Sequence, residues 1–85
     1  MKVTVYTKPQ CVQCEWTKKQ LDRLGVTYES FDVTTDPEAR EAVQHYATNG
    51  EVSMPVVVVT NGAHTTHWCG FKIGLIRGLK DVGDR

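Results

Sequence analysis

The sequence predicts an α/β fold in which strands and helices follow the order βαβαββα around a mixed sheet. Three observations carry this prediction. Short runs of β-forming residues alternate with stretches that repeat apolar residues at helical spacing. Asn61-Gly62 predicts a hairpin between the last two strands, whereas strands separated by a helix favour parallel pairing. The length, 85 residues, fits a single domain over residues 1–85.

The first strand and the first helix are predicted on either side of a short loop. Residues 2–6 are rich in β-forming residues and predict a strand. Residues 7–10 form the loop, where Pro9 suits a position just before a helix. The helix starts at Cys11, and Gly25 ends it. Its apolar stripe comprises Cys14, Thr17, Leu21 and Leu24.

The second strand and the second helix follow. Residues 26–33 alternate loosely between apolar and polar side chains, which predicts a strand. Asp36-Pro37 is a strong helix start, because aspartate caps orphan N–H groups and proline fits the first turn. We expect this helix to end at about His45 or Ala47, with Asn49-Gly50 as the helix breaker.

The last three elements are two strands and a helix. Residues 56–59 are four consecutive valines, so we expect a strand that is buried on both faces and central in the sheet. Residues 64–68 are predicted to form the returning strand of the hairpin. Residues 72–80 predict a helix whose apolar face comprises Leu75, Ile76 and Leu79.

Composition and charge argue against several function classes. Ten Lys and Arg residues balance ten Asp and Glu residues, whereas a dedicated nucleic-acid binder shows a clustered excess of basic residues. The longest apolar run, residues 56–59, is far too short to span a membrane. Residues 1–6 show a strand pattern rather than the charged and apolar pattern of a secretory leader, so we expect no such leader. We therefore expect a cytoplasmic monomer that binds neither nucleic acid nor membrane.

Two of the three cysteines form a Cys-x-x-Cys motif, Cys11-Val12-Gln13-Cys14. A disulfide between them closes a very small loop and therefore stabilises the fold little, so a catalytic role is favoured. At a helix N-terminus, free N–H groups and the helix dipole stabilise a thiolate, so the pKa of Cys11 is expected below the ~8.5 of a free thiol. Lys8 and Lys18 would add positive charge. Cys14 lies one turn further on, on the apolar stripe, so we expect Cys11 to attack and Cys14 to resolve.

Two other interpretations of the cysteines stay open. They could pack simply as small apolar residues. Alternatively, they could belong to a zinc-binding adaptor, because the chain offers a numerically adequate ligand set. That set comprises Cys11, Cys14, His64, His67 and Cys69. Zinc is the weaker hypothesis, because two histidines three positions apart in a strand face opposite sides.

Several segments together resemble one family, the NrdH-type glutaredoxin-like redoxins. The agreement extends over nearly the whole chain, and the Val-Gln pair between the two cysteines is fairly specific. The segments that carry the resemblance are residues 3–14, 17–19, 32–34, 36–39, 55–59 and 67–71.

The resemblance implies a thioredoxin-like fold with three helices and a four-stranded mixed sheet in the order 2-1-3-4. It implies a dithiol–disulfide electron carrier whose redox group is the Cys11–Cys14 pair, with no metal or organic cofactor. Thioredoxin reductase and NADPH would supply its electrons, and an aerobic class Ib ribonucleotide reductase would receive them. It also implies a cis Met54–Pro55 bond beside the cysteines.

A partner-docking surface is expected around the cysteines by the same resemblance. It comprises Lys8, Val12, Gln13, Met54, Pro55, Trp68, Gly70 and Phe71. Core packing is an equally good interpretation for Trp68 and Phe71. Trp16 is a further candidate contact, because it falls on the helix face opposite Cys14.

The chain departs from its relatives near the last helix. Ordinary glutaredoxins carry paired acidic residues there that hold the amino group of glutathione, whereas residues 69–73 contain no acid and place Lys72 in this stretch. A glutathione-dependent glutaredoxin is therefore the disfavoured alternative. Ile73-Gly74 replaces the family's Pro-Asp helix start, which predicts a later or looser start. Cys69 replaces a serine, and we expect it to pack as a small apolar residue rather than form an off-pathway disulfide or glutathione adduct.

Overall fold

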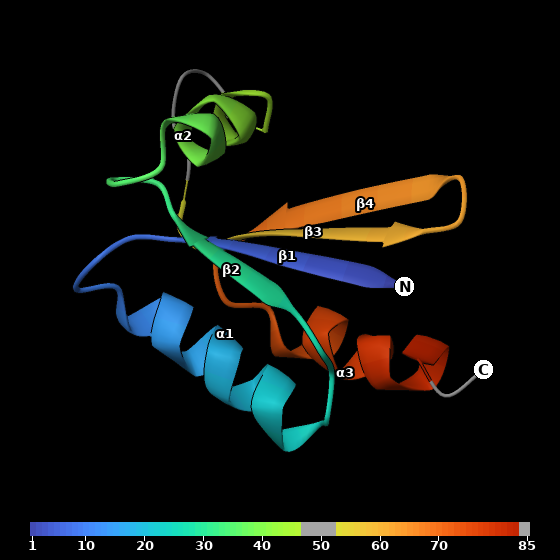
Figure 1. Ribbon diagram of the computed structural model, residues 1–85. Helices are drawn as coiled ribbons and strands as arrows, with labels where there is room; N and C mark the ends of the chain where they lie inside the picture. Colours follow the sequence, from blue (N-terminus) through green and yellow to red (C-terminus); the bar gives the residue numbers. More distant parts are fainter. Residues whose placement is uncertain (47–52, 84–85) are drawn as a thin grey trace.

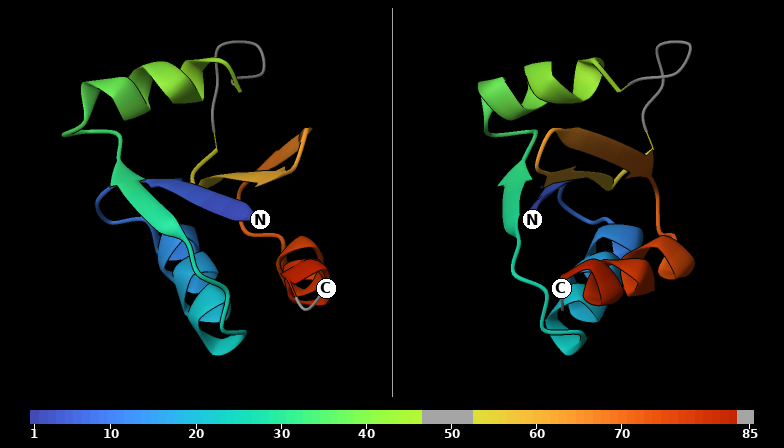
Figure 2. Two further views of the ribbon diagram at one scale, coloured as in Figure 1. Left: turned by 45° about the vertical axis from the view of Figure 1, so that its right-hand side comes forward. Right: turned by 90° about the vertical axis from the view of Figure 1, so that its right-hand side faces the viewer.

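The computed structural model describes residues 1–46 and 53–83, and its elements follow the predicted order βαβαββα. The strands are β1 (Lys2–Thr7), β2 (Glu29–Asp32), β3 (Val56–Asn61) and β4 (His64–Cys69), and the helices are α1 (Val12–Arg23), α2 (Pro37–Gln44) and α3 (Ile73–Gly83). The strands form one sheet in the order β2-β1-β3-β4, as the family resemblance implied. Helices α1 and α3 cover one face of this sheet, and α2 covers the other (Figure 1, Figure 2).

Strand pairing follows from the connections between the strands. β1 and β2 are joined through α1 and pair in parallel, with Tyr6 opposite Phe31. β3 pairs antiparallel with both β1 and β4. Because β3 is therefore an inner strand between two neighbours, all four side chains of residues 56–59 are buried, which confirms the predicted central strand.

The second strand is shorter than the sequence predicts. It pairs with β1 only from Glu29 onward, whereas residues 26–33 were expected to form the strand. The cause lies at the end of α1, where the N–H of Val26 donates to the carbonyl of Leu21 at 3.0 Å. The chain thus stays attached to the helix terminus for three more residues before it reaches the edge of β1.

The hairpin and the helix ends agree closely with the prediction. Asn61 pairs with His64, so the turn is Gly62-Ala63, and Gly62 has a φ of 63° as a tight two-residue turn requires. α2 ends at Gln44, whereas the predicted ends were His45 or Ala47. Ala47 and the predicted breaker Asn49-Gly50 lie outside the residues that the structure describes.

Two apolar clusters hold the layers together, one on each face of the sheet. The cluster under α1 and α3 comprises Val3, Val5, Leu21, Val57, Val59, Trp68, Ile76 and Leu79. The cluster under α2 comprises Val43, Val56 and Val58, with Tyr6, Val33, Tyr46, Met54 and Cys69 partly buried against it. Alternate residues of each strand therefore contribute to opposite clusters, as the two-residue period of a strand requires. Leu21 packs the first helix against the sheet, and the N-terminus of this helix follows the end of β1 after a short loop.

Candidate redox site

The Cys-x-x-Cys motif lies where the chain passes from β1 into α1. A loop over residues 8–10 makes this turn, and Gln10 adopts a left-handed backbone with a φ of 57°. Cys11 is the N-cap of α1, with extended backbone angles, and Cys14 lies in the first turn. Their sulfur atoms are bonded as a disulfide, and their Cα atoms are 5.2 Å apart. The predicted pairing and the predicted position at the helix start are both confirmed.

The two cysteines differ in access to solvent. Cys14 is 1% exposed and packs within the fold, whereas Cys11 is partly exposed. The backbone N–H of Cys14 donates to the Cys11 sulfur at 3.2 Å, so this sulfur occupies the capping position that an oxygen usually fills. Such a donor favours negative charge on its acceptor. A partner can therefore reach Cys11, while Cys14 is sheltered.

The surface beside Cys11 is a shallow hollow of about 300 Å³. It is lined by Gln10, Cys11, Val12 and Glu15. The Val12 side chain is 60% exposed, so the hollow has an apolar rim. Lys18, expected to support the thiolate, instead forms an ion pair with Glu15 at 3.1 Å. Lys8 is exposed in the loop before the motif.

The motif is tied to the segment that follows β4. The Gln13 side-chain oxygen accepts a hydrogen bond from the N–H of Phe71 at 2.8 Å. Gly70 in turn donates its N–H to the carbonyl of Pro55 at 2.8 Å, and the Met54–Pro55 peptide bond is cis, as the resemblance implied. Hydrogen bonds therefore connect the Cys-x-x-Cys motif, the Gly70–Phe71 segment and the Met54–Pro55 segment into one unit.

Gly70 is the residue that this unit requires. Its φ of 82° is a conformation that side chains other than glycine rarely adopt. A Cβ atom at this position would lie 3.2 Å from the Gln13 side-chain oxygen. A larger residue would therefore strain the backbone and crowd the hydrogen bond between Gln13 and Phe71.

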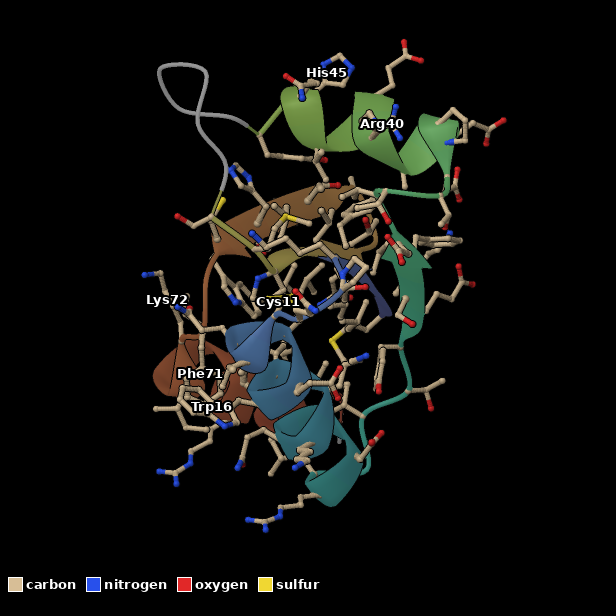
Figure 3. The ribbon with its side chains drawn as sticks, turned by 90° about the vertical axis from the view of Figure 1, so that its left-hand side faces the viewer. Cys11, Trp16, Arg40, His45, Phe71 and Lys72 are labelled. Carbon is tan, nitrogen blue, oxygen red and sulfur yellow. A yellow bond between two sulfur atoms is a disulfide. The ribbon has the colours of Figure 1, made fainter. Side chains whose placement is uncertain are left out.

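An aromatic pair lies next to the motif on the outer face of α1. Trp16 and Phe71 meet edge to face with ring centroids 5.7 Å apart, and Trp16 remains 50% exposed (Figure 3). Lys72 follows Phe71 and is also exposed. The sequence suggested Trp16 and Phe71 separately, but nothing in the sequence shows that two residues so far apart in the chain are in contact.

Trp68 is the docking prediction that the structure corrects. Its side chain is 8% exposed and belongs to the core cluster under α1 and α3. The reason is the alternation along β4, which turns Trp68 toward this cluster and Cys69 toward the cluster under α2. Core packing, the alternative interpretation, is therefore the correct one for Trp68.

The other predicted docking residues are distributed between surface and interior. Val12 and Gln13 are exposed, Phe71 and Met54 are partly buried, and Pro55 and Gly70 are buried. Met54 packs against the cluster under α2.

The candidate zinc ligands of the alternative interpretation do not assemble in the part of the chain that the structure describes. No three His, Cys, Asp or Glu side chains lie close enough there to hold a metal ion. His67 contacts the Tyr46 ring instead, with centroids 4.5 Å apart. Cys69 is a free thiol and packs against the cluster under α2, as its packing interpretation predicted.

Comparison with known proteins agrees with this geometry. The glutaredoxin family model matches residues 3–65. The glutaredoxin-like protein NrdH of Escherichia coli (strain K12) is 35% identical over 79 residues, which cover 93% of this chain and 89% of that protein. This chain belongs to the glutaredoxin family and is of the NrdH type. The E. coli NrdH-redoxin structure, reported for its thioredoxin-like activity profile, superposes with a TM-score of 0.78 at 34% identity, covering 93% of this chain and 95% of that chain.

A second solved structure supports the same fold for this NrdH-type redoxin. The crystal structure of the thioredoxin-like protein BC3987 superposes with a TM-score of 0.75 at 32% identity, and the match covers 92% of this chain and 99% of that one. Within the described residues, none of the helices is long and apolar enough to cross a membrane. The family and the thioredoxin-like fold, both predicted from the sequence, are thus confirmed.

Proposed function

We propose that this NrdH-type redoxin carries electrons from thioredoxin reductase, supplied by NADPH, to a class Ib ribonucleotide reductase. The observation that carries the proposal is the unequal exposure of the cysteine pair. A partly exposed Cys11 can bond to a partner, and a buried Cys14 next to it can release that partner. A disulfide that only stabilises the fold does not require one cysteine to be more exposed to solvent than the other.

The exchange proceeds in two steps from the reduced protein. The Cys11 thiolate attacks one sulfur of the partner's disulfide, forming a mixed disulfide and releasing the partner's other sulfur as a thiolate. Cys14 then loses its proton and attacks the Cys11 sulfur, which breaks the bond to the partner and forms Cys11–Cys14. The partner gains two electrons and, after protonation, two thiols, while this protein is oxidised by the same two electrons. Thioredoxin reductase reverses the change with two electrons from NADPH.

The surroundings of the motif support a protein partner over glutathione. Trp16 and Phe71 present an aromatic surface beside Cys11, and such surfaces suit protein docking. The N–H of Phe71 already donates to Gln13, and the neighbouring charge is the cation Lys72, where glutathione binding would need acidic groups. The E. coli relative's thioredoxin-like activity profile points the same way. We further propose a cytoplasmic location, because this compartment keeps a carrier dithiol reduced.

A paired assay tests the proposal. The oxidised protein is incubated with NADPH and thioredoxin reductase in one reaction, and with NADPH, glutathione and glutathione reductase in another. A disulfide substrate is then added, and turnover is measured as the rate of NADPH consumption. We expect sustained turnover in the first reaction and little in the second. Faster turnover with glutathione would overturn the choice of electron donor in favour of a glutathione-dependent glutaredoxin.

A further inference from the structure

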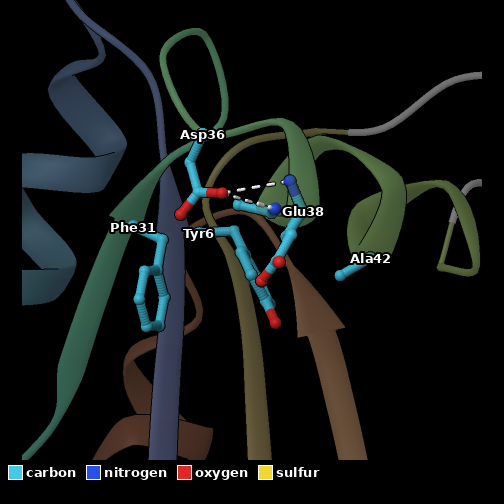
Figure 4. Close-up of a pocket in the computed structure, with 6 residues that line it drawn as sticks. Tyr6, Phe31, Asp36, Glu38 and Ala42 are labelled. Atoms are coloured by element: carbon cyan, nitrogen blue, oxygen red, sulfur yellow. Dashed lines mark hydrogen bonds between the residues drawn. The ribbon is translucent and has the colours of Figure 1, made fainter.

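A second pocket lies on the opposite face of the sheet from α1, between the sheet and helix α2. Its volume is about 270 Å³. It is lined by Tyr6, Phe31, Asp36, Glu38, Ala39 and Ala42 (Figure 4). The two alanines are short, so the space is bounded mainly by aromatic rings and carboxylates. None of these residues belongs to the redox motif.

Two aromatic rings form one side of the pocket. Tyr6 on β1 and Phe31 on β2 are paired in register, and their ring centroids lie 6.1 Å apart at an interplanar angle of 31°. The faces of such rings carry partial negative charge and attract cations. This side of the pocket therefore suits a flat, positively charged group.

Two carboxylates add negative charge at the start of α2. One oxygen of Asp36 accepts hydrogen bonds from the N–H groups of Glu38 at 3.0 Å and Ala39 at 3.2 Å, which leaves its second oxygen outside these bonds. Among the described residues, the single ion pair joins Lys18 and Glu15, so neither carboxylate of the pocket is ion-paired with a lysine or arginine there.

The nearest basic residue along α2, Arg40, binds backbone carbonyl groups and forms no ion pair with a carboxylate of the pocket. Arg40 donates to the carbonyl groups of Val33 and Thr34, each at 3.1 Å. The pKa of Tyr6 is raised mainly by burial, and the nearby Tyr46 and Asp36 raise it further. Of these causes, the Asp36 carboxylate is the one that reflects the negative charge of the pocket.

The pocket lies at the same end of the sheet as the disulfide. Tyr6 is the penultimate residue of β1, and the chain reaches Cys11 after a single short loop. A protein whose cysteine is bonded to Cys11 therefore has part of its surface near this end of the sheet. Because the pocket lies beyond the sheet from α1, its contact would be separate from the Trp16–Phe71 surface.

We propose that this pocket binds the arginine side chain of a redox partner, an inference that rests on the proposed function. A guanidinium group is planar and weakly hydrated, so it stacks on aromatic rings and pairs with carboxylates through two parallel N–H donors. The compact, strongly hydrated ammonium of lysine matches these walls less well. The pocket would thereby select partners that carry arginine close to their reactive disulfide.

The test is an NMR titration of the oxidised, ¹⁵N-labelled protein at low ionic strength. The probe is N-acetyl-arginine N-methylamide, and the neutral citrulline and the lysine analogues are the comparison ligands. We expect saturable shifts of the backbone amides of Tyr6, Phe31, Glu38 and Ala39 with the arginine probe, and weaker binding of both comparison ligands. Equal binding of citrulline, equal binding of lysine, or no saturable shift would overturn the proposal.

Matched variants of α2 test whether binding of the arginine probe depends on the two carboxylates of the pocket. Asp36→Asn keeps an oxygen for the helix cap, and Glu38→Gln keeps the side-chain shape, so the double variant should fold normally while binding weakens about tenfold. Glu41→Gln removes the same charge from an exposed residue of α2 outside the pocket and should leave binding unchanged. An equal loss in Glu41→Gln would overturn the proposal. These binding measurements involve no electron transfer. The arginine proposal can therefore be refuted while the thioredoxin reductase assay supports the proposed function, or the reverse.

Discussion

The hydrogen bond between Gln13 and Phe71 gives the sharpest local prediction of this structure. Replacing Gln13 with alanine removes the acceptor of the Phe71 N–H, whose bond length is 2.8 Å. The bond is neutral and exposed, so its net value is about 1 kcal/mol, which corresponds to roughly a fivefold change in a local opening equilibrium. We therefore expect the Phe71 amide of Gln13→Ala to exchange its hydrogen about fivefold faster in the oxidised protein.

Native-state hydrogen exchange measured by NMR checks this prediction residue by residue. The Gly70 amide is an internal reference, because its acceptor is the Pro55 carbonyl and not Gln13. Gln13→Glu is the matched variant, since it keeps a side-chain oxygen at the same reach and should keep the Phe71 amide protected. Unchanged protection of Phe71 in Gln13→Ala would refute the claim that this side chain ties the motif to the Gly70–Phe71 segment.

Three further predictions concern stability, pH and the third cysteine. Leu21 is fully buried, so Leu21→Ala should lower the free energy of unfolding in urea by about 3 kcal/mol, and a loss below about 1 kcal/mol would contradict the packing described. Hydrogen bonds from the side chain and backbone of Thr34 lower the pKa of Asp32 from 3.8, so an NMR titration of Thr34→Ala should show it rising toward that value. Because the folded pKa is the lower one, the charged carboxylate contributes stability above about pH 4, and this is lost as pH falls through the lowered pKa; no shift in Thr34→Ala would contradict the assignment. Cys69→Ser should leave disulfide turnover unchanged, because Cys69 packs under α2, and a marked loss of turnover would show that this thiol takes part.

The order and type of the elements could be predicted from local signals. The valines of β3, the Asp36-Pro37 helix start and the Gly62 turn each act within a few residues, so the sequence alone identifies them. The length of β2 could not be predicted in this way. It depends on how long the chain remains bonded to the end of α1, and residues 26–28 have the composition of a strand although they pair with none.

The redox pair was predictable, whereas its surroundings were only partly so. Cys11 and Cys14 are close in sequence and lie at a recognisable helix start, so their pairing and their position could be predicted from spacing and capping. The contact between Trp16 and Phe71 joins distant segments and depends on the packing of α1 against the segment before α3. The burial of Trp68 depends on strand register, which sets the face to which each side chain points.

Trapping the mixed disulfide tests the central claim most directly. Reduced Cys14→Ser is mixed with an oxidised class Ib ribonucleotide reductase, and the adduct is identified by non-reducing gel and peptide mapping. We predict a stable complex bonded through Cys11, because the resolving thiol is missing, and no complex with Cys11→Ser. A complex that forms through Cys69, or one that Cys11→Ser forms equally well, would contradict the assignment of Cys11 as the attacking thiol.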